Sequence, residues 1–128
     1  MKEVGYYNGT IGPLAEMTVP IFDRALYFGD GIYEATCVAN GVVFALDDHL
    51  DRMYNSLRLM EIPFKMTRDE IKAELHKVIA AAEPAPCQFL YWQITRGNSS
   101  TASYDREIIR YLFQYFLSNR HRRTSQFN

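Results

Sequence analysis

The segment from Asp23 to Gly41, DRALYFGDGIYEATCVANG, constrains the fold more than any other part of the sequence. The two glycines around Asp30 permit backbone angles that other residues avoid, and the aspartate can hydrogen-bond its own backbone. This pattern predicts a tight turn. The β-branched, small and aromatic residues over 32–39 then predict a strand, and Asn40-Gly41 favours a type I′ hairpin turn into residues 42–45.

Tyr33 stands at the start of this predicted strand, directly after the glycine turn. Because side chains alternate along a strand, Tyr33 and Cys37 are expected on one face and Ile32 and Thr36 on the other. The position is one where a sheet edge opens to a ligand. On the residue pattern alone, a core tyrosine in an ordinary hairpin is the commoner arrangement, and the pattern does not by itself name a function.

Two helices are expected after the hairpin, over residues 47–60 and 67–82. Asp47 and Asp48 suit the N-cap and first turn of the first helix, and the pair Thr67 and Glu70 forms a capping box for the second. Apolar residues recur at helical spacing in both segments. The residues expected to cover one face of a sheet are Leu50, Met53, Leu57, Leu75 and Ile79.

Further strands are expected at both ends of this region. Residues 4–7 and 10–11 flank Asn8-Gly9 and predict a first hairpin, residues 12–22 a loop or edge strand, and residues 87–95 a central strand that is apolar on both faces. At 128 residues the chain is the size of one domain. The order of elements predicts an α+β fold, with an antiparallel-rich sheet covered by two helices.

Composition excludes several classes of partner. A formal net charge of −1 gives no reason to expect nucleic acid or an anionic membrane surface. No apolar run has the length of a signal peptide core or a membrane span, so a cytoplasmic location is the default expectation. Cys37 and Cys87 fall within predicted strands, which favours buried thiols over a disulfide, and no metal site is expected.

Three motifs occur in a fixed order along the chain: F-G-D-G-x-Y-E, H-x-D-R and Q-x-T-R-G, at residues 28–34, 49–52 and 93–97. With them, the chain resembles the class IV (fold-type IV) pyridoxal-phosphate aminotransferases. That family includes D-amino-acid aminotransferase, branched-chain aminotransferase and aminodeoxychorismate lyase. The resemblance covers roughly residues 4–97 and is nearest to the D-amino-acid branch. It implies the small N-terminal domain of the D-amino-acid aminotransferase-like fold.

The resemblance assigns roles to individual residues. It implies that Arg52 binds the phosphate of pyridoxal 5′-phosphate, for which a guanidinium supplies a planar fork of donors. Tyr33 would face the substrate carboxylate, and the two side chains are expected to share a cleft. His49 is expected to orient or pack rather than to transfer a proton. Without the family, Arg52 would be interpreted as a solvated helix arginine beside Asp48 or Asp51.

The sequence also departs from the family. The Arg-x-His pair that grips the substrate carboxylate in D-amino-acid aminotransferases falls on Thr101 and Ser103, which carry no positive charge. None of the lysines lies in a motif for the Schiff-base lysine, so no catalytic residue is predicted within this chain. These lysines are Lys2, Lys65, Lys72 and Lys77. The lysine-bearing C-terminal domain of the family is therefore expected to be absent.

We therefore divide the chain into a class IV small domain, residues 1–97, and a divergent tail, residues 98–128. Apolar residues at helical spacing predict a helix over 104–119. The loss of the family pattern after Gly97 leads us to expect a frameshift or premature end in the gene rather than the native continuation.

Three functions stay open. The first is a truncated transaminase, inactive alone, that belongs to an enzyme transferring an amino group between a D-amino acid such as D-alanine and a 2-oxo acid. In the family such enzymes are homodimers. The second is a fragment of an aminodeoxychorismate lyase or a branched-chain aminotransferase. The third is a non-catalytic remnant. Sequence beyond residue 97 separates the first two from the third.

Overall fold

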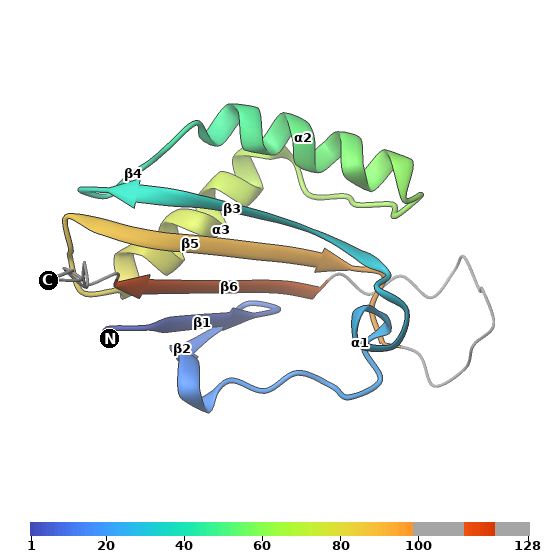
Figure 1. Ribbon diagram of the computed structural model, residues 1–128, viewed down its shortest axis with the longest axis horizontal. Helices are drawn as coiled ribbons and strands as arrows, with labels where there is room; N and C mark the ends of the chain where they lie inside the picture. Colours follow the sequence, from blue (N-terminus) through green and yellow to red (C-terminus); the bar gives the residue numbers. More distant parts are fainter. Residues whose placement is uncertain (99–111, 120–128) are drawn as a thin grey trace, which may run out of the picture.

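A computed structural model describes residues 1–98 and 112–119 of the chain, and all structural statements below concern these residues. One six-stranded sheet carries two long helices on one side (Figure 1). The elements, in chain order, are β1 (Val4–Tyr7), β2 (Thr10–Pro13), the 3-10 helix η1 (Leu14–Glu16), α1 (Arg24–Phe28), β3 (Gly31–Ala39), β4 (Val42–Val43), α2 (Leu46–Leu59), α3 (Arg68–Ala81), β5 (Cys87–Thr95) and β6 (Leu112–Asn119).

The sheet is antiparallel throughout, with the strand order β2-β1-β6-β5-β3-β4. Both predicted Asn-Gly turns are confirmed, because Asn8, Gly9, Asn40 and Gly41 all have positive φ, as a type I′ turn requires. The central position predicted for residues 87–95 is also confirmed: β5 pairs with β3 on one side and with β6 on the other. β3 itself lies near the edge, since the two-residue β4 covers only its end.

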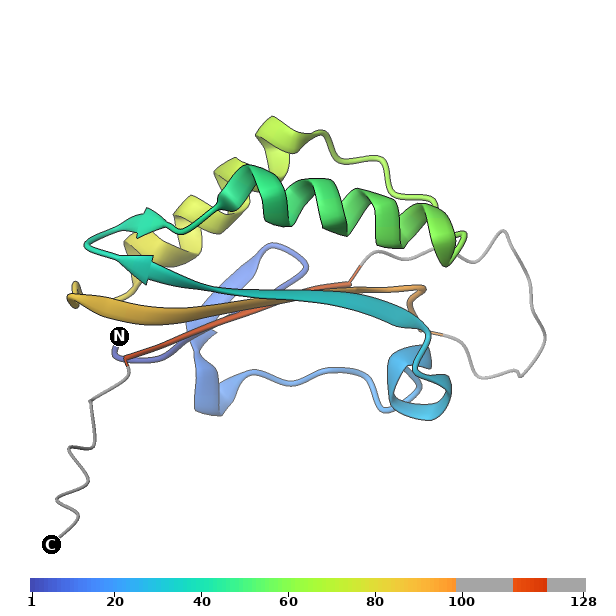
Figure 2. The ribbon, with the colours of Figure 1, turned by 45° about the horizontal axis from the view of Figure 1, so that its top comes forward.

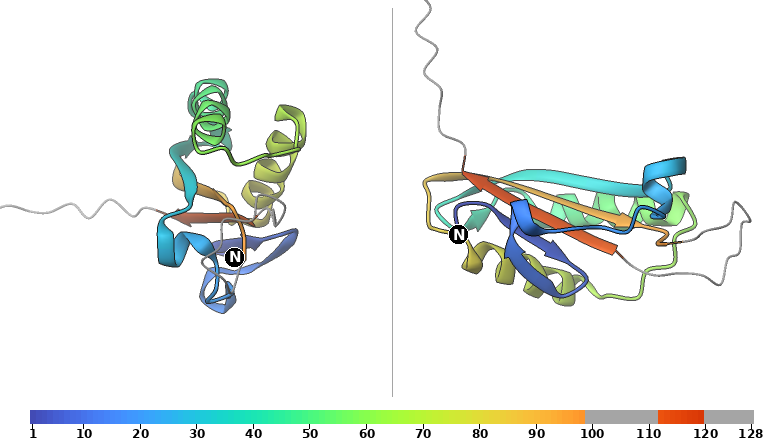
Figure 3. Two further views of the ribbon diagram at one scale, coloured as in Figure 1. Left: turned by 90° about the vertical axis from the view of Figure 1, so that its right-hand side faces the viewer. Right: turned by 90° about the horizontal axis from the view of Figure 1, so that it is seen from below.

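The two predicted helices are confirmed to within one residue at each end. α2 begins at Leu46, after Ala45 in a left-handed conformation, so Asp47 and Asp48 lie in its first turn and neither is the N-cap. α3 begins at the predicted capping box of Thr67 and Glu70. Figures 2 and 3 show both helices on the same side of the sheet, with η1 and α1 on the other side.

The core lies between these helices and the sheet face beneath them. α2 contributes Leu50, Met53 and Leu57, α3 contributes Ile71, Leu75 and Val78, and the strands contribute Ile32, Val38, Leu90, Trp92 and Ile94. Ile79, which we expected in the same layer, is partly buried and packs against it. Trp92, in the middle of β5, is the largest fully buried side chain. The helical stripes therefore predicted the core correctly.

The helix predicted over 104–119 is wrong for residues 112–119, which form β6 between β1 and β5. Residues 104–111 lie outside the described residues. The segment 112–117, LFQYFL, is a short apolar run that suits either kind of element, and its aromatic residues favour a strand. Backbone pairing on both sides decides in favour of the strand.

The expectation of buried thiols is also wrong. Cys37 and Cys87 are both exposed free cysteines. Cys37 alternates with buried residues along β3, so it points to the sheet face opposite the helices, whereas Cys87 is the first residue of β5. Within the part of the chain that the structure describes, no helix has the length and apolar character needed to cross a membrane.

Candidate functional site

The F-G-D-G turn is fixed by a buried aspartate between two buried arginines. One carboxylate oxygen of Asp30, Oδ2, accepts hydrogen bonds from Nε of Arg24 and Nε of Arg96, each at 2.8 Å. All three side chains are buried. Burial raises the pKa of Asp30, but the hydrogen bonds and positive charges of Arg96 and Arg24 outweigh it and hold the pKa below its usual value. The aspartate thus joins the turn to the end of β5, a role beyond the local one expected.

Arg96 extends this connection to helix α2. Its Nη1 donates to the backbone carbonyl of Glu61 at 3.0 Å, and its Nη2 to that of Met60 at 2.8 Å. These carbonyls follow the last turn of α2, where the helix dipole favours a cation. One arginine of the T-R-G motif therefore ties together the turn before β3, the end of β5 and the end of α2. It serves to position the site and does not face the solvent.

A second cluster joins β3 to α2 and contains Arg52. Nε of Arg52 donates to Oε1 of Glu34 at 2.8 Å, and Nη2 donates to Oε2 at 2.6 Å. Nδ1 of His49 lies 2.7 Å from the same Oε2. Because an ionised carboxylate only accepts hydrogen bonds, His49 must carry a hydrogen on Nδ1. His49 also lies edge-on to Trp92, with the ring centres 6.0 Å apart. This supports the orienting role expected for the histidine.

Exposure within this cluster is uneven. The side chain of Glu34 is 2% exposed and that of Arg52 is 66% exposed. Burial raises the pKa of Glu34, but hydrogen bonds from Arg52 and His49 outweigh it, so the pKa falls below its usual value. Hydrogen bonding to Glu34 in turn raises the pKa of Arg52. The cluster therefore holds an ionised carboxylate inside and a guanidinium at the surface.

We expect this carboxylate to make the fold sensitive to acid. A group with a lowered folded-state pKa stabilises the fold above its unfolded pKa, here about 4.5, and loses that contribution as the pH falls through the folded value. Urea unfolding followed by Trp92 fluorescence should therefore show stability falling below about pH 4.5. The Glu34→Gln chain should show a shallower fall. Glu3→Gln, at an exposed site, is the control, and an unchanged slope in Glu34→Gln would contradict the assignment.

Tyr33 lies on the face of β3 opposite to the one that carries Glu34. Tyr33 is 67% exposed, and its ring stacks on Tyr91 of β5, with ring centres 5.5 Å apart. The Tyr91 hydroxyl donates to Oε1 of Gln93 at 2.8 Å. The sheet face opposite the helices thus presents two stacked phenols beside an amide. Aromatic surface with a hydroxyl donor suits a planar ring or a carboxylate.

Arg52 and Tyr33 thus approach from opposite faces of one strand. Among the described residues, no strand pairs with the outer edge of β3 over residues 31–36. This unpaired edge lies between the sheet face that carries Tyr33 and the face that Arg52 contacts. A single cleft shared by both side chains stays a prediction.

Sequence reasoning gave no role to Glu34, Arg24 or Arg96. A signal for Glu34 was present, because it lies two residues from both Ile32 and Thr36 and so shares their core face of the strand. A carboxylate there requires a cationic partner. No such signal indicated that Arg96 is a partner of Asp30, because the two residues are 66 positions apart in the sequence.

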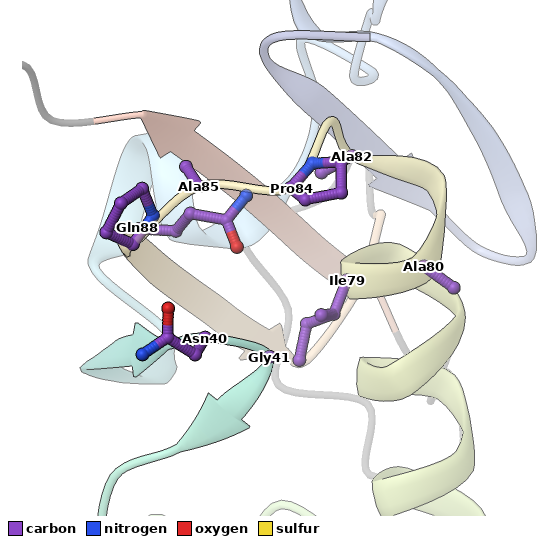
Figure 4. Close-up of a pocket in the computed structure, with 9 residues that line it drawn as sticks. Asn40, Gly41, Ile79, Ala80, Ala82, Pro84, Ala85 and Gln88 are labelled. Atoms are coloured by element: carbon purple, nitrogen blue, oxygen red, sulfur yellow. The ribbon is translucent and has the colours of Figure 1, made fainter.

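The other named residues add little to the site. Lys72 pairs with Asp47 at 2.6 Å and Lys77 with Glu74 at 2.5 Å, so both act as helix-surface residues, as expected. Thr101 and Ser103 lie outside the described residues. A separate pocket of about 570 Å³ lies at the opposite end of β3, between the β3–β4 turn and the end of α3 (Figure 4). Its lining is mostly apolar, with the amides of Asn40 and Gln88 on one side.

Comparison with known proteins supports the motif assignment. A family model for class IV amino-transferases matches residues 31–124, which continues well past Gly97, so the family pattern does not stop where we expected. A D-alanine aminotransferase of Bacillus licheniformis is 34% identical over 93 residues. The match covers 73% of this chain and 32% of that protein. The chain thus spans about a third of the length of this relative.

Solved structures share the fold. A branched-chain amino acid aminotransferase from Escherichia coli superposes with a TM-score of 0.75 at 17% identity, covering 92% of this chain and 40% of that one. A 4-amino-4-deoxychorismate lyase from Pseudomonas aeruginosa gives a TM-score of 0.66 at 26% identity, covering 91% of this chain and 39% of that one. Both likenesses involve less than half of the larger protein.

Proposed function

Because this chain belongs to the class IV aminotransferase family, we propose that it supplies part of the active site of a pyridoxal-phosphate-dependent transaminase. The reaction would move an amino group from a D-amino acid such as D-alanine to a 2-oxo acid. The observation that carries this proposal is the Arg52 guanidinium, which is exposed to solvent and fixed by the buried Glu34. The similarity to D-alanine aminotransferase supports the choice of substrate.

The residues present fit the cofactor. Arg52 offers a planar cation at the surface, which suits a phosphate dianion. Tyr33 offers an exposed hydroxyl that can donate to a substrate carboxylate without adding charge. When bound, pyridoxal phosphate would supply the electron sink that stabilises negative charge on the amino-acid Cα. We propose that the lysine that binds the cofactor lies in a region equivalent to the part of the relatives that this chain does not match.

A homodimer is part of the same proposal. Large apolar side chains on and beside α1 are more than half exposed, and Phe22 stacks on Tyr27 with ring centres 6.3 Å apart. The exposed residues are Ile21, Leu26, Tyr27 and Phe28. An apolar patch of this kind is typical of an interface with another domain or subunit.

We expect the 128-residue chain alone not to transaminate. Incubated with pyridoxal phosphate, D-alanine and 2-oxoglutarate, it should form no pyruvate above a heat-denatured control, because none of its lysines lies in the family motif. Borohydride treatment should leave no cofactor on a single defined peptide. Steady pyruvate formation, or cofactor attached at one lysine, would contradict this.

A fusion tests the function itself. Residues 1–97 would be joined to the remaining part of the Bacillus licheniformis D-alanine aminotransferase. The fusion should produce pyruvate from D-alanine, and Arg52→Gln in the fusion should weaken cofactor binding about tenfold or more, the effect of losing a charge-assisted hydrogen bond. A folded fusion that binds the cofactor equally well with Gln at position 52 would refute the role of Arg52.

The second candidate is an aminodeoxychorismate lyase, favoured by the 26% identity with the Pseudomonas aeruginosa enzyme. Assaying a fusion of residues 1–97 to the rest of that lyase would separate the two candidates. Activity of only one fusion would identify the better match.

A further inference from the structure

Glu34 is an unusual residue for the position it occupies. It lies on the core face of β3, where its neighbours on the same face include Ile32 and Thr36, and its side chain is only 2% exposed. Burying an ionised carboxylate is costly unless hydrogen bonds from cations compensate for the lost water. Glu34 receives such bonds from Arg52 and His49. Its placement therefore has a consequence for both partners.

The geometry of the pair fixes the orientation of the Arg52 side chain. Glu34 engages Nε and Nη2, which form one side of the Arg52 guanidinium. Within residues 1–98 and 112–119, Nη1 makes no hydrogen bond. Because the guanidinium is planar, fixing one side of it also fixes the direction of the opposite side. The N–H groups of Arg52 that do not bond to Glu34 therefore point in one direction in the absence of a ligand.

We propose that Glu34 is a positioning residue that holds Arg52 ready to receive the phosphate group of pyridoxal phosphate. This inference rests on the proposed function of Arg52. A long, exposed arginine side chain loses rotamer freedom when it binds a ligand, and a partner that has already ordered it reduces that loss. His49 supports the arrangement, because its Nδ1 holds the same carboxylate oxygen that accepts from Nη2.

A competing interpretation predicts the opposite sign. If Glu34 only neutralised Arg52, the carboxylate would repel an incoming phosphate, and its removal would strengthen anion binding. If Glu34 positions Arg52, its removal frees the side chain and weakens binding. Measuring the affinity of a Glu34→Gln chain therefore separates the two interpretations. Glutamine has nearly the same shape but lacks the charge and one of the two oxygen acceptors.

The experiment uses the 128-residue chain and pyridoxine 5′-phosphate, which keeps the phosphate and the ring but has no aldehyde to react with lysines. Arginine side-chain NMR follows the Nε–H signal of Arg52. In the native chain this hydrogen should exchange with water more slowly than that of Arg58, whose hydrogen bond to Asn55 uses Nη2 only. The phosphorylated compound should shift the Arg52 signal, and pyridoxine without phosphate should not.

In Glu34→Gln the Arg52 signal should exchange faster, and the affinity for pyridoxine 5′-phosphate should fall about tenfold, because binding must then order a free arginine side chain. Asp51→Asn is the matched control, because it removes an exposed carboxylate from the residue next to Arg52 and should leave the affinity unchanged. A folded Glu34→Gln chain that binds equally well or more tightly would overturn the positioning role.

Two further outcomes keep the test decisive. Rapid exchange of the native Arg52 Nε–H, equal to that of Arg58, would refute the positioning role without any variant, even if Glu34→Gln does not fold. A native chain in which pyridoxine 5′-phosphate leaves the Arg52 signal unchanged would instead refute Arg52 as the phosphate ligand. The failure of the proposed function is therefore distinct from the failure of Glu34 as its support.

Discussion

Replacing Asp30 with alanine is expected to lower the free energy of unfolding by about 3–5 kcal/mol, the usual cost of removing one partner from a buried ion pair. Asp30 is 7% exposed and accepts from two arginines that are themselves buried. Without it, Arg24 and Arg96 would lose the carboxylate that compensates their charges. The loss is a large fraction of the 5–15 kcal/mol that is typical of a whole domain.

Urea unfolding monitored by circular dichroism measures this effect directly. The control is Asp51→Ala, which removes an exposed carboxylate paired with Arg68 and should cost less than about 1 kcal/mol. A loss below about 1 kcal/mol for Asp30→Ala as well would show that the turn is held by its backbone alone. In that case Asp30 would not be needed to position Tyr33 and Glu34, which follow the turn within four residues.

Trp92→Ala should have a comparable effect, lowering the free energy of unfolding by about 3–5 kcal/mol. Trp92 is fully buried at the centre of β5, and its Nε1–H donates to the sulfur of Met53 at 3.4 Å. The substitution would leave a cavity between the sheet and α2. His49 would also lose the ring against which it rests, so the site should loosen along with the core.

The matched control for this prediction is Phe44→Ala, because Phe44 is also aromatic but is 70% exposed. Its loss should change the free energy of unfolding by no more than about 0.5 kcal/mol, as for other surface substitutions. Thermal and urea unfolding of both variants provide the measurement. Equal losses for the two aromatic residues would mean that the core is not centred on Trp92.

Local sequence patterns predicted those parts of the fold that local physics determines. The Asn-Gly turns required positive φ, which few residues adopt, and the apolar stripes of α2 and α3 could be buried on one side only. β6 could not be predicted in this way. Its apolar run suits a helix or a strand, and the choice depends on β1 and β5, which lie far away in the sequence.

The candidate site shows the same division. Motif spacing predicted Arg52 and His49 on one helix, which the structure confirms, but it did not predict that both contact the carboxylate of Glu34. The pairing of Asp30 with Arg96 joins residues at opposite ends of the helical region, and no spacing rule connects them. The exposure of Cys37 depended on which sheet face the helices cover, and strand composition does not determine this.

The position of β6 also affects the order in which the molecule can assemble. Among the described residues, the β1–β2 hairpin bonds to the rest of the sheet only through β6, in which Leu117 pairs with Val4 on one side and with Leu90 on the other. During synthesis, the β1–β2 hairpin can therefore join the sheet only after β6 has been made. Until then β1 and β5 each keep an unpaired edge. Such long-range closure slows folding and leaves these strand edges exposed to other chains until β6 has formed.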